Sequence, residues 1–138
     1  MQHKLHLSHT HLETLYKHAE DSFPLEAAAL LFGLVSGPSV IVHRIEPVHN
    51  EAKSSKISFM VNPEEQYHLL VEAEEEGLEL VGIFHSHPAP PYPSKRDKEN
   101  MKLNPVVWLI ASKDTGNWAS KAFLLEDEQI VEMDLRLS

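Results

Sequence analysis

The sequence predicts an α/β protein, in which a mixed β-sheet is covered on its faces by helices and a single domain spans residues 1–138. Segments with helical periodicity alternate along the chain with short apolar runs that are typical of strands. The chain has 138 residues, of which 42% are hydrophobic, and this is enough to form one sizeable core. Its sequence shows no linker, low-complexity tract or internal repeat.

The first half of the chain predicts one helix followed by strands. Ser8 precedes a segment, residues 9–22, whose apolar side chains recur at helical spacing. We therefore expect a helix that is capped by Ser8 and ends before Pro24. Three apolar or alternating runs then predict strands, the second being the hairpin partner of the first, and they lie at residues 27–37, 39–48 and 57–61.

The second half predicts two helices among further strands. Asn62 and Pro63 are a favoured cap and a favoured first residue, so they open a helix that ends at Gly77. A short helix is expected to begin near Ser94. Apolar and branched residues predict four more strands, at residues 78–85, 105–112, 119–126 and 129–137.

The composition excludes several classes of function. The chain has no cysteine, so disulfides, thiolate metal sites and a cysteine nucleophile are ruled out, and any metal must be bound by nitrogen and oxygen ligands. A formal net charge of -9 disfavours binding to nucleic acid or anionic lipid. No signal peptide or membrane-spanning run is apparent, and we expect a soluble cytoplasmic protein.

Two histidines at the end of a predicted strand form a candidate metal site. His85 and His87 are two residues apart, and in a strand such side chains point to the same side of the sheet. Both imidazoles can therefore reach one ion. A catalytic zinc usually has three protein ligands and a water, so a third ligand is required.

Asp97 is the candidate third ligand. It follows a loop with four prolines, which stiffen the chain and can return it to the metal in one geometry. A competing interpretation needs no metal, since Ser94 and Asp97 have the spacing of a helix cap. On its own Asp97 fits the cap better, whereas together with His85 and His87 it favours the metal site.

Glu26 is a candidate base for a metal-bound water. It lies at the mouth of a predicted buried strand, where an ionised carboxylate is costly unless it is paired or hydrogen-bonded. A catalytic water is one possible partner, and a salt bridge or simple exposure are the alternatives. Spacing alone does not distinguish Glu26 from Glu46 or Glu13.

These residues together resemble a known family. The run His85-Ser86-His87-Pro88, then Ser94-x-x-Asp97, with Glu26 upstream, is similar to the JAMM signature of MPN-domain metalloproteases, in its compact prokaryotic form. The resemblance extends from about residue 12 to residue 112 and includes His49-Asn50. The chain departs from the family pattern in a loop one residue shorter before Ser94 and in Ala28-Ala29, where a Cys-Gly pair is usual.

The resemblance implies a fold, a mechanism and a substrate class. The fold would be cytidine-deaminase-like, with zinc on His85, His87 and Asp97. Glu26 would be the general base and Ser94 would stabilise the tetrahedral intermediate. The expected reaction is hydrolysis of a peptide or isopeptide bond by zinc-bound water, at the C-terminal tail of a ubiquitin-like or sulfur-carrier protein.

Two other functions are weighed against this one. Many MPN domains are non-catalytic scaffolds for protein interactions, but the resemblance implies that those scaffolds lack the ligand set that is present here. A zinc deaminase of the usual kind requires two cysteines, which this chain does not have.

A second His-x-His pair, His9 and His11, provides a control for the metal hypothesis. It lies at a predicted helix start, where residues two apart diverge by about 200° around the axis and cannot share an ion. Changing both to Gln should leave metal content and peptidase activity unaltered, as measured by elemental analysis and a cleavage assay. A loss of either would contradict the assignment.

Overall fold

The computed structural model describes residues 3–48, 63–87, 91–114 and 116–138. Three helices and seven strands are formed over these residues. The helices are α1 (His9–Ser22), α2 (Pro63–Glu75) and α3 (Lys95–Leu103). The strands are β1 (Lys4–Leu7), β2 (Ala28–Ser36), β3 (Ser39–Val48), β4 (Glu79–His87), β5 (Val107–Asp114), β6 (Asn117–Glu126) and β7 (Gln129–Leu137).

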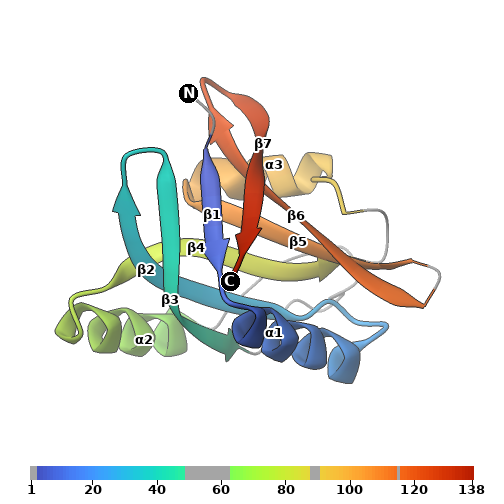
Figure 1. Ribbon diagram of the computed structural model, residues 1–138, viewed down its shortest axis with the longest axis horizontal. Coiled ribbons are helices and arrows are strands. Elements are labelled where there is room, and N and C mark those ends of the chain that lie inside the picture. Colours follow the sequence, from blue (N-terminus) through green and yellow to red (C-terminus); the bar gives the residue numbers. More distant parts are fainter. Residues whose placement is uncertain (1–2, 49–62, 88–90, 115) are drawn as a thin grey trace.

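The strands form one closed barrel in the order β1-β3-β2-β4-β5-β6-β7 (Figure 1). Strand β1 pairs in parallel with both β3 and β7, and β4 pairs in parallel with β5. The remaining neighbours are antiparallel. The sheet is therefore mixed, as the sequence predicts, but it has no free edge.

The expected cytidine-deaminase-like fold, a sheet flanked by helices, is wrong because the sheet closes into a barrel. Closure depends on β1, which the sequence analysis missed. Its four residues, KLHL, lie in a polar N-terminal stretch and are too few for a clear strand pattern. Leu5 and Leu7 are nevertheless fully buried, and β1 fills the gap between β3 and β7.

The other elements agree closely with the prediction. Helix α1 has Ser8 as its N-cap, with the hydroxyl accepting a hydrogen bond from the His11 N–H at 3.0 Å. Each predicted helix and strand of the described residues is present to within a few positions. The strand predicted at 57–61, the cap at Asn62, and His49, Asn50, Pro88 and Pro90 lie outside the described residues.

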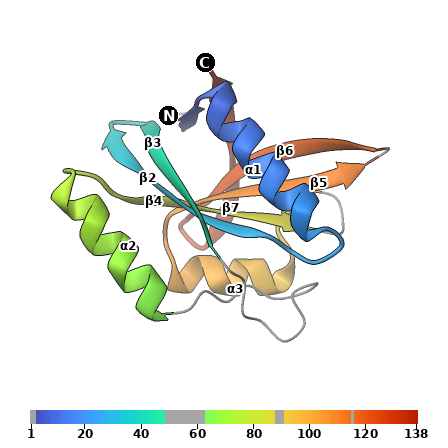
Figure 2. The same cartoon turned by 90° about the horizontal axis from the view of Figure 1, so that it is seen from below.

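Two hydrophobic clusters hold the central strands from their two sides. One combines β1, α1 and the side chains of β2, β4 and β5 that point the same way, and it includes the fully buried Leu15 and Phe84. The other packs the opposite side of these strands against α2 and α3, around Trp108 and Met101. Figure 2 shows α1 on one side of these strands and α2 and α3 on the other. Both faces of β2, β4 and β5 are consequently buried.

Besides its apolar packing, helix α2 contacts β3 through Arg44. Arg44 lies within 2.9 Å of Glu72 and Glu46 and also contacts Glu76. These carboxylates raise the pKa of Arg44 above its already high ordinary value. Because the carboxylates of α2 are largely exposed, the network orients α2 on β3 more than it adds to the stability of the fold.

No helix among the described residues is long and apolar enough to cross a membrane.

Gly33 is required where β2 and β3 approach each other most closely. The β2–β3 register shifts between Phe32 and Gly33, and a Cβ on Gly33 would lie 1.8 Å from the Ile41 carbonyl oxygen. Gly33→Ala should therefore lower the free energy of unfolding by about 3 kcal/mol or more, measured by chemical denaturation. Ser36→Ala, at an exposed position of the same strand, should change it by less than about 0.5 kcal/mol. A loss below about 1 kcal/mol for Gly33→Ala would mean that the hairpin can open at this point.

Candidate functional site

The alternation of side chains along β2 and β4 brings the predicted site residues to one side of the sheet. Ala28 pairs with His85 in the antiparallel β2–β4 ladder. Glu26 precedes Ala28 by two residues, and His87 follows His85 by two. The side chains of these residues therefore point to the same side of the sheet. This is the side on which α3 packs through its buried Met101.

Asp97, from α3, faces both histidines. Its Oδ1 lies 3.5 Å from His85 Nε2, and its Oδ2 lies 3.5 Å from His87 Nε2. The two imidazole rings are 5.7 Å apart and nearly perpendicular. His85 and Asp97 are buried, and His87 is only slightly exposed. The three side chains that the sequence analysis selected are thus brought together.

The capping interpretation of Ser94 and Asp97 is confirmed. Asp97 N–H donates to Ser94 Oγ at 3.1 Å, and Ser94 N–H donates to Asp97 Oδ2 at 2.8 Å. This capping box fixes the carboxylate at the first turn of α3. The cap orients Asp97 toward the histidines, so a capping role does not exclude a role as a metal ligand.

Glu26 contacts the same cluster from the segment just before β2. Its Oε1 lies 3.2 Å from His85 Nδ1, and the side chain is almost completely buried. Each nitrogen of the His85 ring thus faces one carboxylate, Glu26 on one side and Asp97 on the other. Glu13 and Glu46, which spacing could not exclude, lie elsewhere: Glu13 is on α1, and Glu46 pairs with Arg44.

Ser86 and Trp108 support the cluster, and the sequence analysis did not assign them a role. The Ser86 hydroxyl accepts from the Ala27 N–H at 2.7 Å, and Ser86 N–H donates to the Ala27 carbonyl at 3.0 Å. These bonds hold the backbone beside Glu26 against β4. The Trp108 ring lies 5.6 Å from the His85 ring, edge to face, and closes the inner side of the site. Ser86 lies between the two histidines in the sequence, and this position was the available signal for its role.

The described residues contain no group of three histidine or acidic side chains that already satisfies the spacing of a metal-binding cluster. Two of the separations between individual donor atoms are 3.5 Å, which requires only a small adjustment around a bound ion.

The control pair, His9 and His11, lies on the first turn of α1, as predicted. His9 is exposed, and neither histidine joins the cluster around His85.

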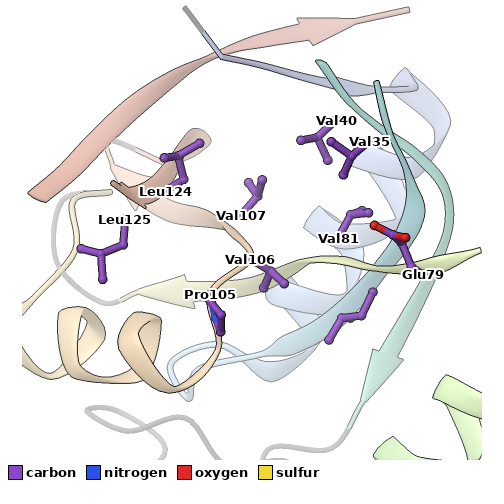
Figure 3. A pocket seen from close by; sticks show the side chains of 10 residues that line it. Val35, Val40, Glu79, Val81, Pro105, Val106, Val107, Leu124 and Leu125 are labelled. Atoms are coloured by element: carbon purple, nitrogen blue, oxygen red, sulfur yellow. The ribbon is translucent and has the colours of Figure 1, made fainter. Parts of the chain in front are cut away.

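A larger hollow of about 400 Å³ lies at the opposite end of β4 (Figure 3). It is lined mostly by valine, leucine and proline, and Glu79 is its one acidic lining residue. Glu79 begins β4 and His87 ends it, which places the two ends about 26 Å apart along an extended strand. The hollow is therefore separate from the cluster of titratable residues.

Comparison with known proteins identifies the family. The prokaryotic homologs of the JAB domain match the chain over residues 8–125. The chain belongs to this prokaryotic JAB family. The resemblance to the JAMM/MPN proteins that the sequence motif indicated is thereby confirmed.

This prokaryotic JAB protein is similar to several named proteins. The desampylase of Pyrococcus furiosus is 42% identical over 97 residues, which are 70% of this chain and 66% of that protein. The desampylase of Haloferax volcanii is 31% identical over 105 residues, 74% of this chain and 76% of that protein. The probable TtuB-protein conjugate cleaving protease of Thermus thermophilus is 32% identical over 93 residues, 67% of this chain and 60% of that protein. The matched region spans just under two thirds of the Pyrococcus protein.

Solved structures have the same fold as this prokaryotic JAB protein. A protein of Desulfitobacterium hafniense, solved in solution, matches with a TM-score of 0.84 and 31% identity, covering 97% of this chain and 92% of that chain. A protein of Salinibacter ruber matches with a TM-score of 0.71 and 23% identity, covering 98% of this chain and 91% of that chain. The second match supports the fold alone.

Ser86→Ala tests how β2 is held at the site. The change leaves the buried Ala27 N–H without its acceptor, which should lower the free energy of unfolding by about 1–3 kcal/mol in chemical denaturation. Ser36→Ala, which removes an exposed hydroxyl from β2, should have almost no effect. Equal stability of the two variants would show that the Ser86–Ala27 bond does not hold this segment.

Proposed function

We propose that this prokaryotic JAB protein is a zinc-dependent hydrolase of peptide or isopeptide bonds at the C-terminal tail of a ubiquitin-like or sulfur-carrier protein. The observation that carries the proposal is the convergence of His85, His87 and Asp97, with Glu26 against the same cluster. The names of the relatives support it, since they describe desampylases and a conjugate-cleaving protease.

The donor set fits zinc. Two ligands of a tetrahedral zinc, each about 2.0 to 2.1 Å from the ion, lie roughly 3.3 to 3.4 Å apart, close to the 3.5 Å separations from Asp97 to the two histidines. When bound, zinc would acidify a water and polarise the scissile carbonyl.

Glu26 would move the proton. Its carboxylate takes one proton from the attacking water, whose oxygen forms a bond to the carbonyl carbon. It then gives that proton to the departing nitrogen as the carbon–nitrogen bond breaks, so the products are a free carboxyl and a free amine. With Oε1 facing His85 Nδ1, its second oxygen remains for this transfer.

Ser94 would stabilise the developing oxyanion. Its oxygen already accepts a hydrogen bond from Asp97 N–H, but its own hydroxyl hydrogen is not used in that bond. The hydroxyl can therefore donate toward the site while the capping box holds it in place. In other enzymes, one well-placed donor of this kind contributes about 3 to 4 kcal/mol to transition-state stabilisation.

The alternative, a non-catalytic interaction scaffold, would not require this arrangement. A buried carboxylate against a buried imidazole is costly to maintain without a compensating role. The test below distinguishes the two functions, because a scaffold would show no turnover that depends on Glu26.

Glu26→Gln should retain zinc and lose turnover. The amide keeps nearly the same shape and can still accept a hydrogen bond from His85 Nδ1, but it cannot accept a proton. We expect kcat on a ubiquitin-like carrier conjugate to fall by roughly 10²- to 10⁴-fold, with metal content unchanged by elemental analysis. His87→Ala and His85→Ala, by contrast, should lose both metal and activity.

Full activity in Glu26→Gln would refute the proposed mechanism. Loss of zinc from this variant would instead make Glu26 a ligand and leave Asp97 with the capping role alone. Stoichiometric metal in His87→Ala would show that the ligand assignment is wrong.

A further inference from the structure

An exposed apolar segment leads directly into the site. Phe23, Pro24 and Leu25 are all exposed, with about half the surface of Phe23 and of Leu25 accessible. The next residue, Glu26, is buried. Three consecutive apolar residues at the surface beside a buried carboxylate are a candidate contact surface for a ligand.

A small groove connects this segment to the site. Phe23, Pro24, Leu25 and Trp118 form its apolar walls, and Glu26, Ser86 and His87 form its inner end. The groove is shallow, with room for about 10 Å³ inside it, so a ligand would lie along its open face against the exposed side chains. It is therefore continuous with the cluster that the proposed function uses.

The Trp118 wall is held firmly in place. Tyr16 of α1 stacks on Trp118 with ring centroids 6.2 Å apart, and the Phe23 ring meets Trp118 edge-on at 6.2 Å. Tyr16 hydroxyl is 2.7 Å from Ser120 Oγ, and burial raises the pKa of Tyr16, so its hydroxyl stays protonated.

A cation lies against the same two rings. Lys113 Nζ is 5.2 Å from the Phe23 centroid and 6.0 Å from the Trp118 centroid. Glu20 holds this ammonium through both carboxylate oxygens, at 2.7 and 2.8 Å. The charge is neutralised locally, so the groove attracts a ligand through its apolar walls.

The position of Glu26 determines which part of the substrate can enter the groove. In the proposed function Glu26 gives its proton to the departing nitrogen, so that nitrogen must lie within hydrogen-bond reach of Glu26. Glu26 forms the inner end of the groove. The amine side of the scissile bond therefore faces Phe23 and Trp118, and the carrier tail approaches from elsewhere.

We propose that this groove binds the methylene stem of the target lysine whose ε-nitrogen is released, so that Phe23 and Trp118 make the enzyme selective for isopeptide bonds. The inference rests on the proposed function. Within an isopeptide bond the lysine nitrogen is an uncharged amide. The methylene stem of that lysine is apolar and can pack against aromatic rings. Each methylene removed from water favours binding by about fourfold, so a partly buried stem should give roughly tenfold selectivity or more.

The test compares two substrates that differ only on the amine side. One is a ubiquitin-like sulfur-carrier protein joined through its C-terminal carboxyl to the ε-amine of a blocked lysine. The other is the same carrier as its C-terminal methylamide, which lacks the stem. Binding is measured by calorimetry with zinc-loaded Glu26→Gln, whose turnover should be roughly 10²- to 10⁴-fold slower, and kcat/KM is measured with the unmodified protein.

We expect the lysine conjugate to bind about tenfold or more tightly than the methylamide, and its kcat/KM to be higher by a similar factor. Phe23→Ala should reduce this ratio to near one, and because Phe23 is exposed the variant should fold. Trp118→Leu provides a second variant with the same expected result. Tyr67→Ala removes a comparably exposed aromatic ring from α2 and should preserve the ratio.

The outcomes separate this inference from the function on which it rests. Equal binding and cleavage of both substrates, or a ratio unchanged by Phe23→Ala and Trp118→Leu, would overturn the inference and leave the hydrolase intact. An equal loss on both substrates would also overturn it, because the groove would then hold the shared carrier tail. Cleavage of neither substrate by the zinc-loaded protein would overturn the proposed function and this inference with it.

Discussion

The antiparallel pairing of β2 with β4 is the constraint on which the site depends. It sets Ala28 opposite His85, and from that register the alternation of side chains carries Glu26 and His87 to the same side of the sheet. A shift of one residue in either strand would turn Glu26 away from the histidines. The two hydrogen bonds between Ser86 and Ala27 hold the register at its last position, beside the groups that would do chemistry. The arrangement of side chains at this end of the barrel is thus a consequence of backbone pairing more than of any one side chain.

Helix α3 supplies the Asp97 carboxylate, which the sheet alone could not place opposite the histidines. A strand can place two histidines on one side, but a third donor must come from another element facing them. Met101 anchors α3 in the cluster that includes Trp108, and Trp108 in turn packs against His85. The capping box at Ser94 then directs Asp97 from the start of that anchored helix. Core packing and helix capping therefore act together to position one carboxylate.

The sequence was sufficient to predict most elements and to select four side chains that lie close together, and the reasons are local. Caps, turn residues and periodicity act over a few residues, so α1, β3 and β7 could be read directly. The closure of the sheet could not be predicted, because β1 is short and its partners, β3 and β7, are far away in the chain. The role of Ser86 was missed for a similar reason, since its partner, Ala27, lies 59 residues away. Periodicity also cannot reveal that Phe23 and Trp118 meet beside Glu26, because that contact joins the end of α1 to β6.

The parallel pairing of β1 with β7 has a consequence for how the chain folds. Lys4 pairs with Asp134, so the earliest and the latest strands become neighbours, and the barrel can close only after the last strand has been synthesised. Contacts between such distant segments carry a high loop-closure entropy and slow folding. The cluster around His85 uses only β2, β4 and α3, which are all made earlier. During synthesis on the ribosome, the end of the molecule that holds the His85 cluster can therefore assemble while the opposite seam of the barrel is still open.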